Sequence, residues 1–196
     1  MKNFIPEITS CDKCQLRMNC TRVVPGEGNP HAEIMFIGEA PGRQEELRGR
    51  PFVGAAGRLL NRLLKIINIK REDVYITNLV KCRPPQNRDP LPEEIESCSE
   101  WLNEQVRSVR PKLIVLLGRL STNRFLPHVR ISEVHGRNFK EDIISLGTFV
   151  LFPTYHPAAA LYNRSLEKSL EDDFKKIPEL LAKIEGESGR KAGSNS

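Results

Sequence analysis

Short apolar runs rich in valine and isoleucine alternate with segments of helical periodicity, and this alternation limits the possible folds more than any other feature. Four such runs occur: EIMFIG at 33–38, VYITNLV at 74–80, KLIVLLG at 112–118 and FVLFPTY at 149–155. Runs of this length and composition are typical of parallel strands buried on both faces. We therefore expect an α/β fold, a three-layer α/β/α sandwich around a central, mainly parallel four-stranded sheet.

Four helices are expected between and after these strands. The segment 55–69 repeats apolar residues at helical spacing and so has one apolar face, formed by Leu59, Leu60, Leu63, Leu64 and Ile67. Pro92 marks the start of a second helix that runs to about residue 109. A third helix is expected at about 119–126 and a fourth at about 165–185. The Gly- and Ser-rich tail, 186–196, is predicted to be disordered.

Length and charge restrict the class of protein. A chain of 196 residues with 39% hydrophobic content can bury one core, so we expect a single domain over 1–185. The net charge of +5 suits a polyanionic partner such as nucleic acid, although many basic proteins bind none. No apolar run approaches the roughly 20 residues of a membrane span, and the N-terminus lacks the apolar core of a secretory signal. These features predict a soluble cytoplasmic protein.

Conspicuous residues follow three of the predicted strands. The sequence GEAPG occupies 38–42, Asn78 ends the second strand, and YHPAAAL at 155–161 follows the last. Ligands of doubly wound α/β folds collect at the carboxyl ends of the strands, so these segments are expected to line one pocket. GEAPG lacks the lysine and hydroxyl residue of a phosphate loop and the glycine spacing of a dinucleotide-binding turn. ATP and NAD are therefore poor candidates as ligands.

Four of the five cysteines form a second possible site. Cys11 and Cys14 make a CDKC pair, while Cys82 and Cys98 lie far along the chain and would have to be brought to them by the fold. Four thiolates suit either tetrahedral zinc or a four-iron cluster, and the spacing does not choose between them. A redox role of the CDKC pair is disfavoured because it does not lie at a strand-to-helix turn. Cys20 is left over, and the sequence favours a partly buried free thiol at least as much as a further ligand.

Taken together, these motifs resemble the iron–sulfur, or family 4, uracil-DNA glycosylases. The resemblance covers nearly the whole chain, from CDKC through GEAPG, GRPFVGAAGRLLNRLL and TNLVKCRPPQNRDP to YHPAAAL. It implies the uracil-DNA glycosylase superfamily fold and an enzyme that removes uracil from DNA and leaves an abasic site for base excision repair. It also implies one 4Fe-4S cluster, held by Cys11, Cys14, Cys82 and Cys98.

The resemblance also implies roles for residues around the base. Phe52 would stack on uracil, Glu45 would crowd the methyl group of thymine, and the backbone near Ala40 and Gly42 would orient uracil or water. Asn78 would read the pyrimidine edge, since its amide oxygen can accept from uracil N3–H while its NH2 group donates to O4.

Two further residues are expected to carry the chemistry. His156 would donate a hydrogen bond toward uracil O2 as negative charge develops there. Glu39 would stabilise the cationic sugar or act as general base for the attacking water. Relatives with a GQDPYH motif have an aspartate where this chain has Ala40, which favours the stabilising role of Glu39.

DNA must be bound and its base flipped out for such chemistry. In the superfamily the segment after the His-Pro step fills the vacated space, which makes Leu161, Tyr162 and Asn163 candidates for insertion, with Arg164 for a phosphate. Basic residues near the cysteine loop are further candidates for phosphate contacts: Lys81, Arg83 and Arg88.

Two other functions remain compatible with the sequence. One is a glycosylase of the same fold that acts mainly on hypoxanthine or xanthine, and the other is a metal-stabilised DNA-binding module without catalysis. A variant that is trapped covalently on DNA is disfavoured, because the basic, histidine-containing insertion of that subgroup is absent after Cys82. We expect a monomer, and a sliding clamp or another replication or repair protein is a possible partner.

Overall fold

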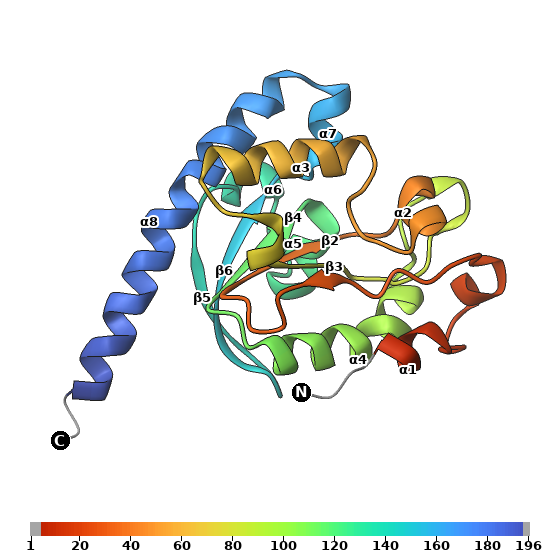
Figure 1. The fold of residues 1–196 in the computed structure, drawn as a ribbon, viewed down its shortest axis with the longest axis horizontal. Helices are drawn as coiled ribbons and strands as arrows, with labels where there is room; N and C mark the ends of the chain where they lie inside the picture. Colours follow the sequence, from red (N-terminus) through yellow and green to blue (C-terminus); the bar gives the residue numbers. More distant parts are fainter. Residues whose placement is uncertain (1–4, 194–196) are drawn as a thin grey trace.

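A six-stranded sheet lies at the centre of the structure (Figure 1). The structure is a computed structural model that describes residues 5–193, and the side chains as far as residue 187. The strand order is β1-β3-β2-β4-β6-β5. The four inner strands are parallel, and the two edge strands pair antiparallel to their neighbours. The strands are β1 (Glu27–Gly28), β2 (Ile34–Gly38), β3 (Tyr75–Asn78), β4 (Leu113–Leu117), β5 (Phe139–Ile143) and β6 (Gly147–Thr154).

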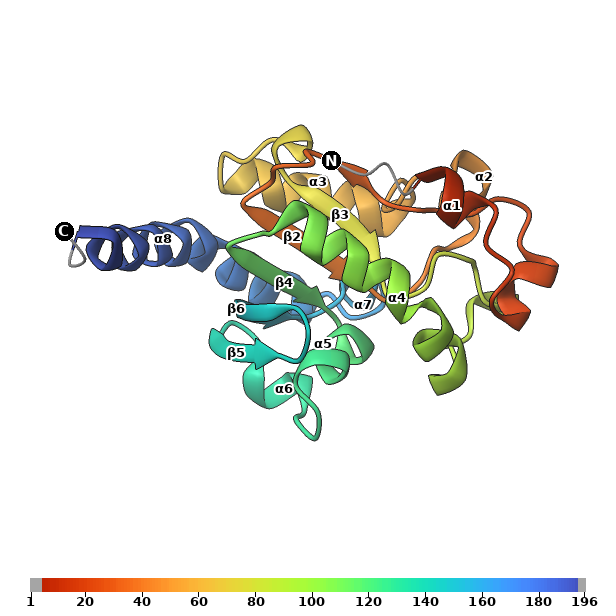
Figure 2. The same ribbon diagram turned by 90° about the horizontal axis from the view of Figure 1, so that it is seen from below.

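Helices cover both faces of this sheet and make the three layers visible in Figures 1 and 2. The helices are α1 (Ile5–Thr9), α2 (Arg43–Arg48), α3 (Ala55–Ile66), α4 (Pro92–Val109), α5 (Arg119–Phe125), α6 (Ile131–Val134), α7 (Pro157–Tyr162) and α8 (Ser165–Gly193). Alternate residues of each inner strand point to opposite faces of the sheet. One face therefore packs against α3, α7 and α8, and the other packs against α4 and α5.

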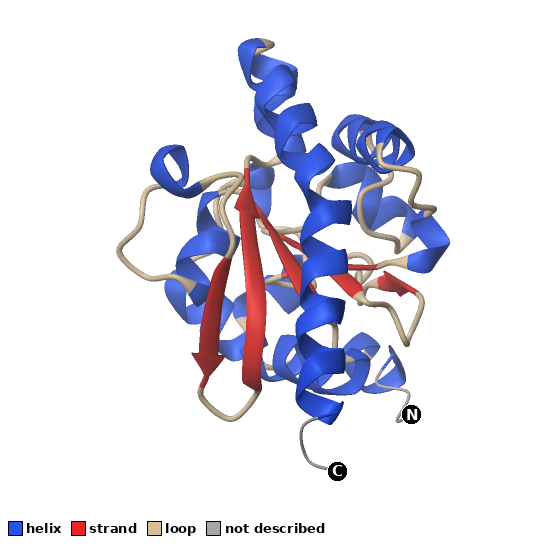
Figure 3. Cartoon of the chain, turned by 90° about the vertical axis from the view of Figure 1, so that its left-hand side faces the viewer, coloured by secondary structure: helices blue, strands red, loops and turns tan. Residues whose placement is uncertain are grey.

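Helix α3 shows how the sequence pattern directs this packing. Leu59, Leu60, Leu63 and Leu64 lie on one side of the helix and are buried in the core with Phe36 and Phe174. The rings of Phe36 on β2 and Phe174 on α8 stack with their centroids 5.8 Å apart, which ties α8 to the sheet. Helix α8 crosses this face of the sheet and extends beyond it (Figure 3).

The α/β/α sandwich predicted from the sequence is confirmed, and the four expected strands are β2, β3, β4 and β6. The prediction of a four-stranded sheet is wrong in number, because β1 and β5 add antiparallel strands at the edges. Strand β1 has only two residues, and β5, FKEDI, carries three charged residues, so neither forms an apolar run.

The last helix is longer than expected. Helix α8 does not end near 185 but continues to Gly193, and disorder of the tail stays a prediction. Residues 194–196 lie outside the described residues, as do 1–4. Throughout the described part of the chain, no helix combines the length and apolar character needed to cross a bilayer.

Two substitutions on α3 test the assignment of its buried face. Leu60 is fully buried, whereas Ile66 on the same helix is 38% exposed. We expect Leu60→Ala to lower the free energy of unfolding by about 2–5 kcal/mol, because it leaves a cavity in the core. Ile66→Ala should cost about 1 kcal/mol or less. Urea unfolding followed by circular dichroism measures both, and equal losses would contradict the assignment.

Candidate active site

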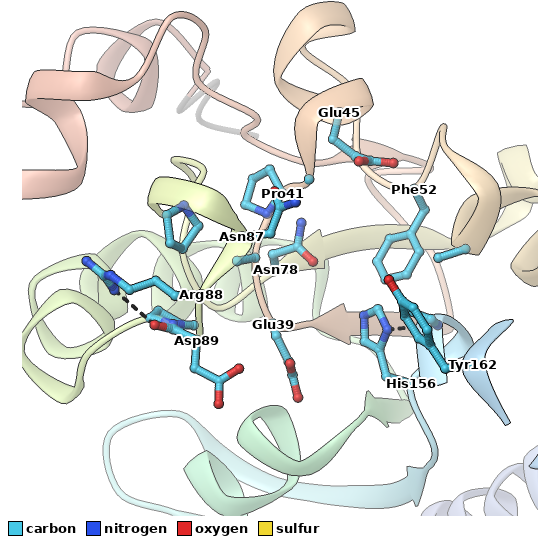
Figure 4. Close-up of a pocket in the computed structure, with 16 residues that line it drawn as sticks. Glu39, Pro41, Glu45, Phe52, Asn78, Asn87, Arg88, Asp89, His156 and Tyr162 are labelled. Atoms are coloured by element: carbon cyan, nitrogen blue, oxygen red, sulfur yellow. Dashed lines mark hydrogen bonds between the residues drawn. The ribbon is translucent and has the colours of Figure 1, made fainter. Parts of the chain in front are cut away.

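A pocket of about 330 Å³ opens at the carboxyl ends of the parallel strands (Figure 4). Its walls come from the segments at the ends of β2, β3 and β6, from the loop between α2 and α3, and from the loop that precedes α4. The lining residues are Glu39, Ala40, Pro41, Gly42, Glu45, Phe52, Ala56, Asn78, Pro84, Asn87, Arg88, Asp89, Pro90, His156, Ala158 and Tyr162. The structure thus brings together every residue that the sequence analysis placed around the base.

Asn78 is the last residue of β3 and its side chain reaches the floor of the pocket. The residue is 2% exposed, and its Oδ1 atom has no hydrogen-bond partner among the residues that the structure describes. The adjacent strand contributes Gly38, where a Cβ would lie 2.4 Å from Asn78 Oδ1 and 2.7 Å from Phe52 Cζ. Only glycine therefore permits Asn78 and Phe52 to approach β2 this closely. A buried acceptor without a partner is costly unless a ligand supplies the donor.

Phe52 forms one wall of the pocket together with His156. The two rings stack with centroids 5.5 Å apart and an angle of 30° between their planes. Phe52 has a φ of 49°, a left-handed conformation that is rare for an aromatic residue. Helix α3 packs tightly on this turn, since a Cβ at Gly57 would lie 1.9 Å from the carbonyl oxygen of Phe52. The strained backbone directs an aromatic face into the pocket and not into the core alone.

His156 has a defined tautomer in this position. Its Nδ1 accepts a hydrogen bond of 3.1 Å from the backbone N–H of Ala158, at the start of α7. The proton of the neutral ring therefore resides on Nε2, which is left as a donor. Burial lowers the pKa of His156 to about 4, and the nearby Glu45 carboxylate only partly opposes this shift. At neutral pH the pocket holds a neutral imidazole.

Glu39 follows β2 and meets the opposite side of the pocket. Burial raises the pKa of its carboxyl group, and the negative charge of Asp89 adds to this effect. The backbone N–H of Leu120 donates to its Oε1 at 3.1 Å, and this bond and Arg119 lower the pKa in part. The turn after β4 favours glycine, because Gly118 has a φ of 95° and a Cβ there would lie 2.9 Å from His156 Cβ and 2.7 Å from Glu39 Oε1.

Glu45 lies at the rim of the pocket and is not the solvated charge that its surroundings in the sequence suggest. Its Oε1 accepts hydrogen bonds from the backbone N–H groups of Val53 and Gly54, at 2.9 and 2.7 Å. The carboxylate thereby closes the loop that carries Phe52. Ala40 and Gly42 line the pocket beside it, as the resemblance implied.

The sequence analysis missed two polar residues of the pocket, Asn87 and Asp89. They belong to the QNRDP segment, where Gln86 and Asn87 both have a φ near +55°. Consecutive left-handed residues turn this loop back over the pocket. The only signal in the sequence is the density of Asn, Asp and Pro between two elements, which indicates a turn but not its direction.

The residues proposed to contact DNA fall into two groups. Leu161 is 49% exposed, and Tyr162 is 93% exposed beside the pocket, while Arg164 is also exposed. Arg83 and Arg88 are tied to carboxylates of the protein: Arg83 contacts Glu46, and Arg88 makes two hydrogen bonds to Glu94 at 2.8 and 2.6 Å. Their guanidinium groups retain only part of their donors for a phosphate.

The suggestion that Lys81 meets a phosphate is wrong. Lys81 is 2% exposed, and its ammonium group donates three hydrogen bonds to oxygen atoms inside the protein. Burial lowers the pKa of Lys81 to about 8. The side chain lies under the pocket, where nucleic acid has no access to it.

The four cysteines expected to bind a cluster line one small cavity between the N-terminal segment and α4. The indole N–H of Trp101 points at Cys11 Sγ, at 3.2 Å. Cys20 lies in the same apolar cluster but does not line the cavity. Among residues 5–193, no three His, Cys, Asp or Glu side chains converge as they would around a single metal ion.

Four thiols that line one cavity are a donor set that a four-iron cluster can use. Each cysteine of such a cluster binds a different iron, so its four sulfurs surround the cluster and do not converge on one point. The cavity has four thiols, apolar walls and three basic residues, Lys13, Arg17 and Lys81, but no carboxylate. The cavity measures about 20 Å³.

The fold and the pocket define the class of protein as an α/β enzyme whose site lies at the carboxyl ends of parallel strands. In this site an aromatic face lies beside an amide, an imidazole and a carboxylate. The family model of the uracil DNA glycosylase superfamily matches residues 25–182. The type-4 uracil-DNA glycosylase of Saccharolobus solfataricus is 48% identical, over 97% of this chain and 95% of the relative.

Relatives of the same name in other organisms are equally similar. The enzyme of Sulfurisphaera tokodaii is 52% identical over 89% of this chain and 81% of its own length. The enzyme of Archaeoglobus fulgidus is 50% identical over 93% of this chain and 94% of its own length. The chain belongs to the uracil-DNA glycosylase superfamily and, within it, to the type-4 uracil-DNA glycosylases.

The state of His156 can be measured directly. We expect its ring to stay neutral, with the proton on Nε2, as the pH falls from 7 until it reaches about 4. Long-range ¹H–¹⁵N spectra report both the tautomer and the titration. An exposed imidazole titrates near 6.5, so a midpoint there, or a proton on Nδ1, would contradict the geometry.

Proposed function

We propose that this enzyme flips uracil out of DNA and hydrolyses its N-glycosidic bond, which leaves an abasic site and begins base excision repair inside the cell. The observation that carries the proposal is the buried Oδ1 of Asn78, an acceptor without a partner at the floor of a pocket. Uracil N3–H supplies the missing donor, and the NH2 group of Asn78 donates to O4.

Selectivity follows from the same amide. Cytosine presents an acceptor at N3 and a donor at C4, so both polarities are reversed and each mismatched group costs about 1–3 kcal/mol. Phe52 stacks on the base, a contact that any base would accept. Glu45, whose carboxylate accepts from two backbone N–H groups, is proposed to crowd the methyl group of thymine. Backbone groups near Ala40 and Gly42 orient the base or the water.

Cleavage of the glycosidic bond leaves uracil with the bonding electrons and gives the sugar oxocarbenium character. The Nε2–H of neutral His156 donates to uracil O2, where the negative charge develops. The Glu39 carboxylate faces the cationic sugar and orients the water that adds to C1′. The proton of that water passes to the Glu39 carboxylate and finally to the uracil anion, so the products are neutral uracil and the abasic sugar.

The DNA duplex has to be opened for this reaction, because a stacked base does not expose its glycosidic carbon. Leu161 and its exposed neighbour Tyr162 are the last two residues of α7, the helix that begins directly after His156, and we propose that this segment enters the space of the flipped base. Arg164, Arg83 and Arg88 are proposed to contact phosphates. Binding of a sliding clamp or another repair protein to the monomer stays a prediction.

Cys11, Cys14, Cys82 and Cys98 are proposed to hold one 4Fe-4S cluster. When bound, it supplies a structural cross-link between the N-terminal segment, the loop after β3 and helix α4. The glycosidic reaction transfers no electrons, so the cysteines act on activity only through the position of that loop.

Glu39→Gln separates activity from stability. A buried carboxylate whose pKa is raised destabilises the folded state once it is ionised, and a neutral amide removes that cost. We expect Glu39→Gln to slow uracil release from a U·G duplex by about 100-fold or more while unfolding at the same temperature as wild type or higher at pH 7. In the wild type, activity should fall as the pH drops through the raised pKa of Glu39, above the ordinary 4.5.

Glu27→Gln is the matched control. Ion pairs with Arg50 and Arg71 lower the pKa of Glu27, so its carboxylate stabilises the fold at neutral pH. Glu27→Gln should therefore lower the melting temperature and leave uracil release unchanged. Release by Glu39→Gln at the wild-type rate would exclude the assigned role. Preferential release of hypoxanthine or xanthine from competing duplexes would favour a different substrate, and DNA binding without any release would favour a non-catalytic module.

The cysteine assignment makes a separate prediction. Protein purified without oxygen should be brown and contain about four irons per chain. Cys98→Ser should lose most of the iron, whereas Cys20→Ser, an equally buried cysteine outside the cavity, should retain it. Iron analysis and visible absorbance measure both variants. Equal iron in the two variants would show that Cys98 is not a ligand.

A further inference from the structure

A buried lysine lies directly beneath the residue that reads the base. Lys81 Nζ donates to the main-chain carbonyl oxygen of Asn78 at 2.7 Å, to Thr77 Oγ1 at 2.7 Å and to Gln105 Oε1 at 2.8 Å. All three acceptors are oxygen atoms, so each N–H of a complete ammonium group has a partner. No acidic side chain is among them. A lysine buried in this way is uncommon and costs stability, which calls for an explanation in the site.

The contact with Asn78 is important because little else holds the amide of that residue. Within the described part of the chain its Oδ1 has no partner, so no hydrogen bond from there to this oxygen fixes the rotation of the side chain. The direction of the amide depends instead on the Asn78 backbone and on the close contact at Gly38. Lys81 binds the Asn78 carbonyl, and the N–H of Leu79 pairs with Gly38 on the neighbouring strand.

The hydrogen-bond network around Lys81 extends to β3, to α4 and to the segment before β1. Gln105 belongs to α4, and its Nε2 donates to the carbonyl of Pro25 at 2.6 Å. Thr77 also contacts Pro25 through its hydroxyl. Lys81 immediately precedes Cys82, and α4 also carries Cys98, so the two elements that bear these cysteines meet at the ammonium group.

We propose that Lys81 is a positioning residue for uracil recognition: its ammonium group fixes the Asn78 backbone and so aims the Asn78 amide at the base. The inference rests on the proposed function and adds a residue that does not touch the substrate. It predicts that loss of the ammonium group acts on the base through Asn78 and leaves the surface that binds DNA unchanged.

A double-mutant cycle tests this. Asn78→Ala, Lys81→Met and the double variant are compared by single-turnover release of uracil from a U·G duplex, by inhibition with free uracil and by binding to a duplex with a tetrahydrofuran abasic site. We expect Lys81→Met to reduce release and uracil affinity by about tenfold or more, and to add less than about twofold in the Asn78→Ala background. Affinity for the abasic duplex, which presents no base to Asn78, should stay within about twofold of wild type.

A milder pair of variants keeps the test decisive if Lys81→Met does not fold. Thr77 and Thr122 are both fully buried, but Thr77 accepts a hydrogen bond from Lys81, whereas the Thr122 hydroxyl has no partner among the described residues. Thr77→Val should weaken inhibition by free uracil by about threefold to tenfold. Thr122→Val, an equally conservative change, should leave it unaltered.

The outcomes separate this inference from the proposed function. Equal losses from Lys81→Met in the presence and absence of Asn78, or a parallel loss of affinity for the abasic duplex, would overturn the positioning role, as would equal effects of Thr77→Val and Thr122→Val. If the wild-type protein releases uracil and Lys81→Met does so equally well, the positioning role of Lys81 is overturned and the proposed function stands. A wild-type protein that releases no uracil would overturn the proposed function itself.

Discussion

The parallel pairing of β2 with β3 and β4 is the constraint on which the site depends. In this register Gly38 at the end of β2 lies opposite Asn78 at the end of β3. Strand β4 pairs in turn with β6, where Leu117 lies opposite Thr154. All these strands therefore end at one edge, and the residues that follow them are brought within contact distance. The absence of a side chain at Gly38 and Gly118 then permits the approach of Asn78, Phe52, Glu39 and His156. A Cβ at either glycine would overlap a functional side chain.

Burial in this pocket acts on its two titratable groups in opposite directions. It raises the pKa of Glu39 and lowers the pKa of His156, because it disfavours the charged form of each. The imidazole therefore stays neutral and has an N–H to donate, while ionisation of the carboxylate costs stability. The unpartnered oxygen of Asn78 is a third cost in the same place. Such costs are characteristic of sites in which a ligand, and not the fold, completes the interactions.

The sequence was sufficient for the elements whose signals are local and strong. The valine- and isoleucine-rich runs identified the four parallel strands, and their carboxyl ends led to Glu39, Asn78 and His156. Strand β5 could not be found in this way, because FKEDI has little apolar character and is defined by its pairing with β6. The burial of Lys81 could not be predicted from the sequence either. Its acceptor Gln105 comes from α4, 24 residues away, and only the tertiary structure turns an apparently basic loop into a buried network.

A second buried ionisable side chain lies close to His156. Asp173 on α8 is 2% exposed and accepts hydrogen bonds from Thr154 Oγ1 at 2.8 Å and from His135 at 2.9 Å when Nδ1 carries the proton. Thr154 ends β6, two residues before His156, and its carbonyl accepts from the N–H of Gly118. The end of β6 is thus fixed from α8, as the end of β3 is fixed from α4. The opposite faces of the sheet each contribute one buried ionisable group, and these supports from outside the pocket act together with the contacts inside it, the stack of Phe52 on His156 and the bond from the Ala158 N–H to His156 Nδ1.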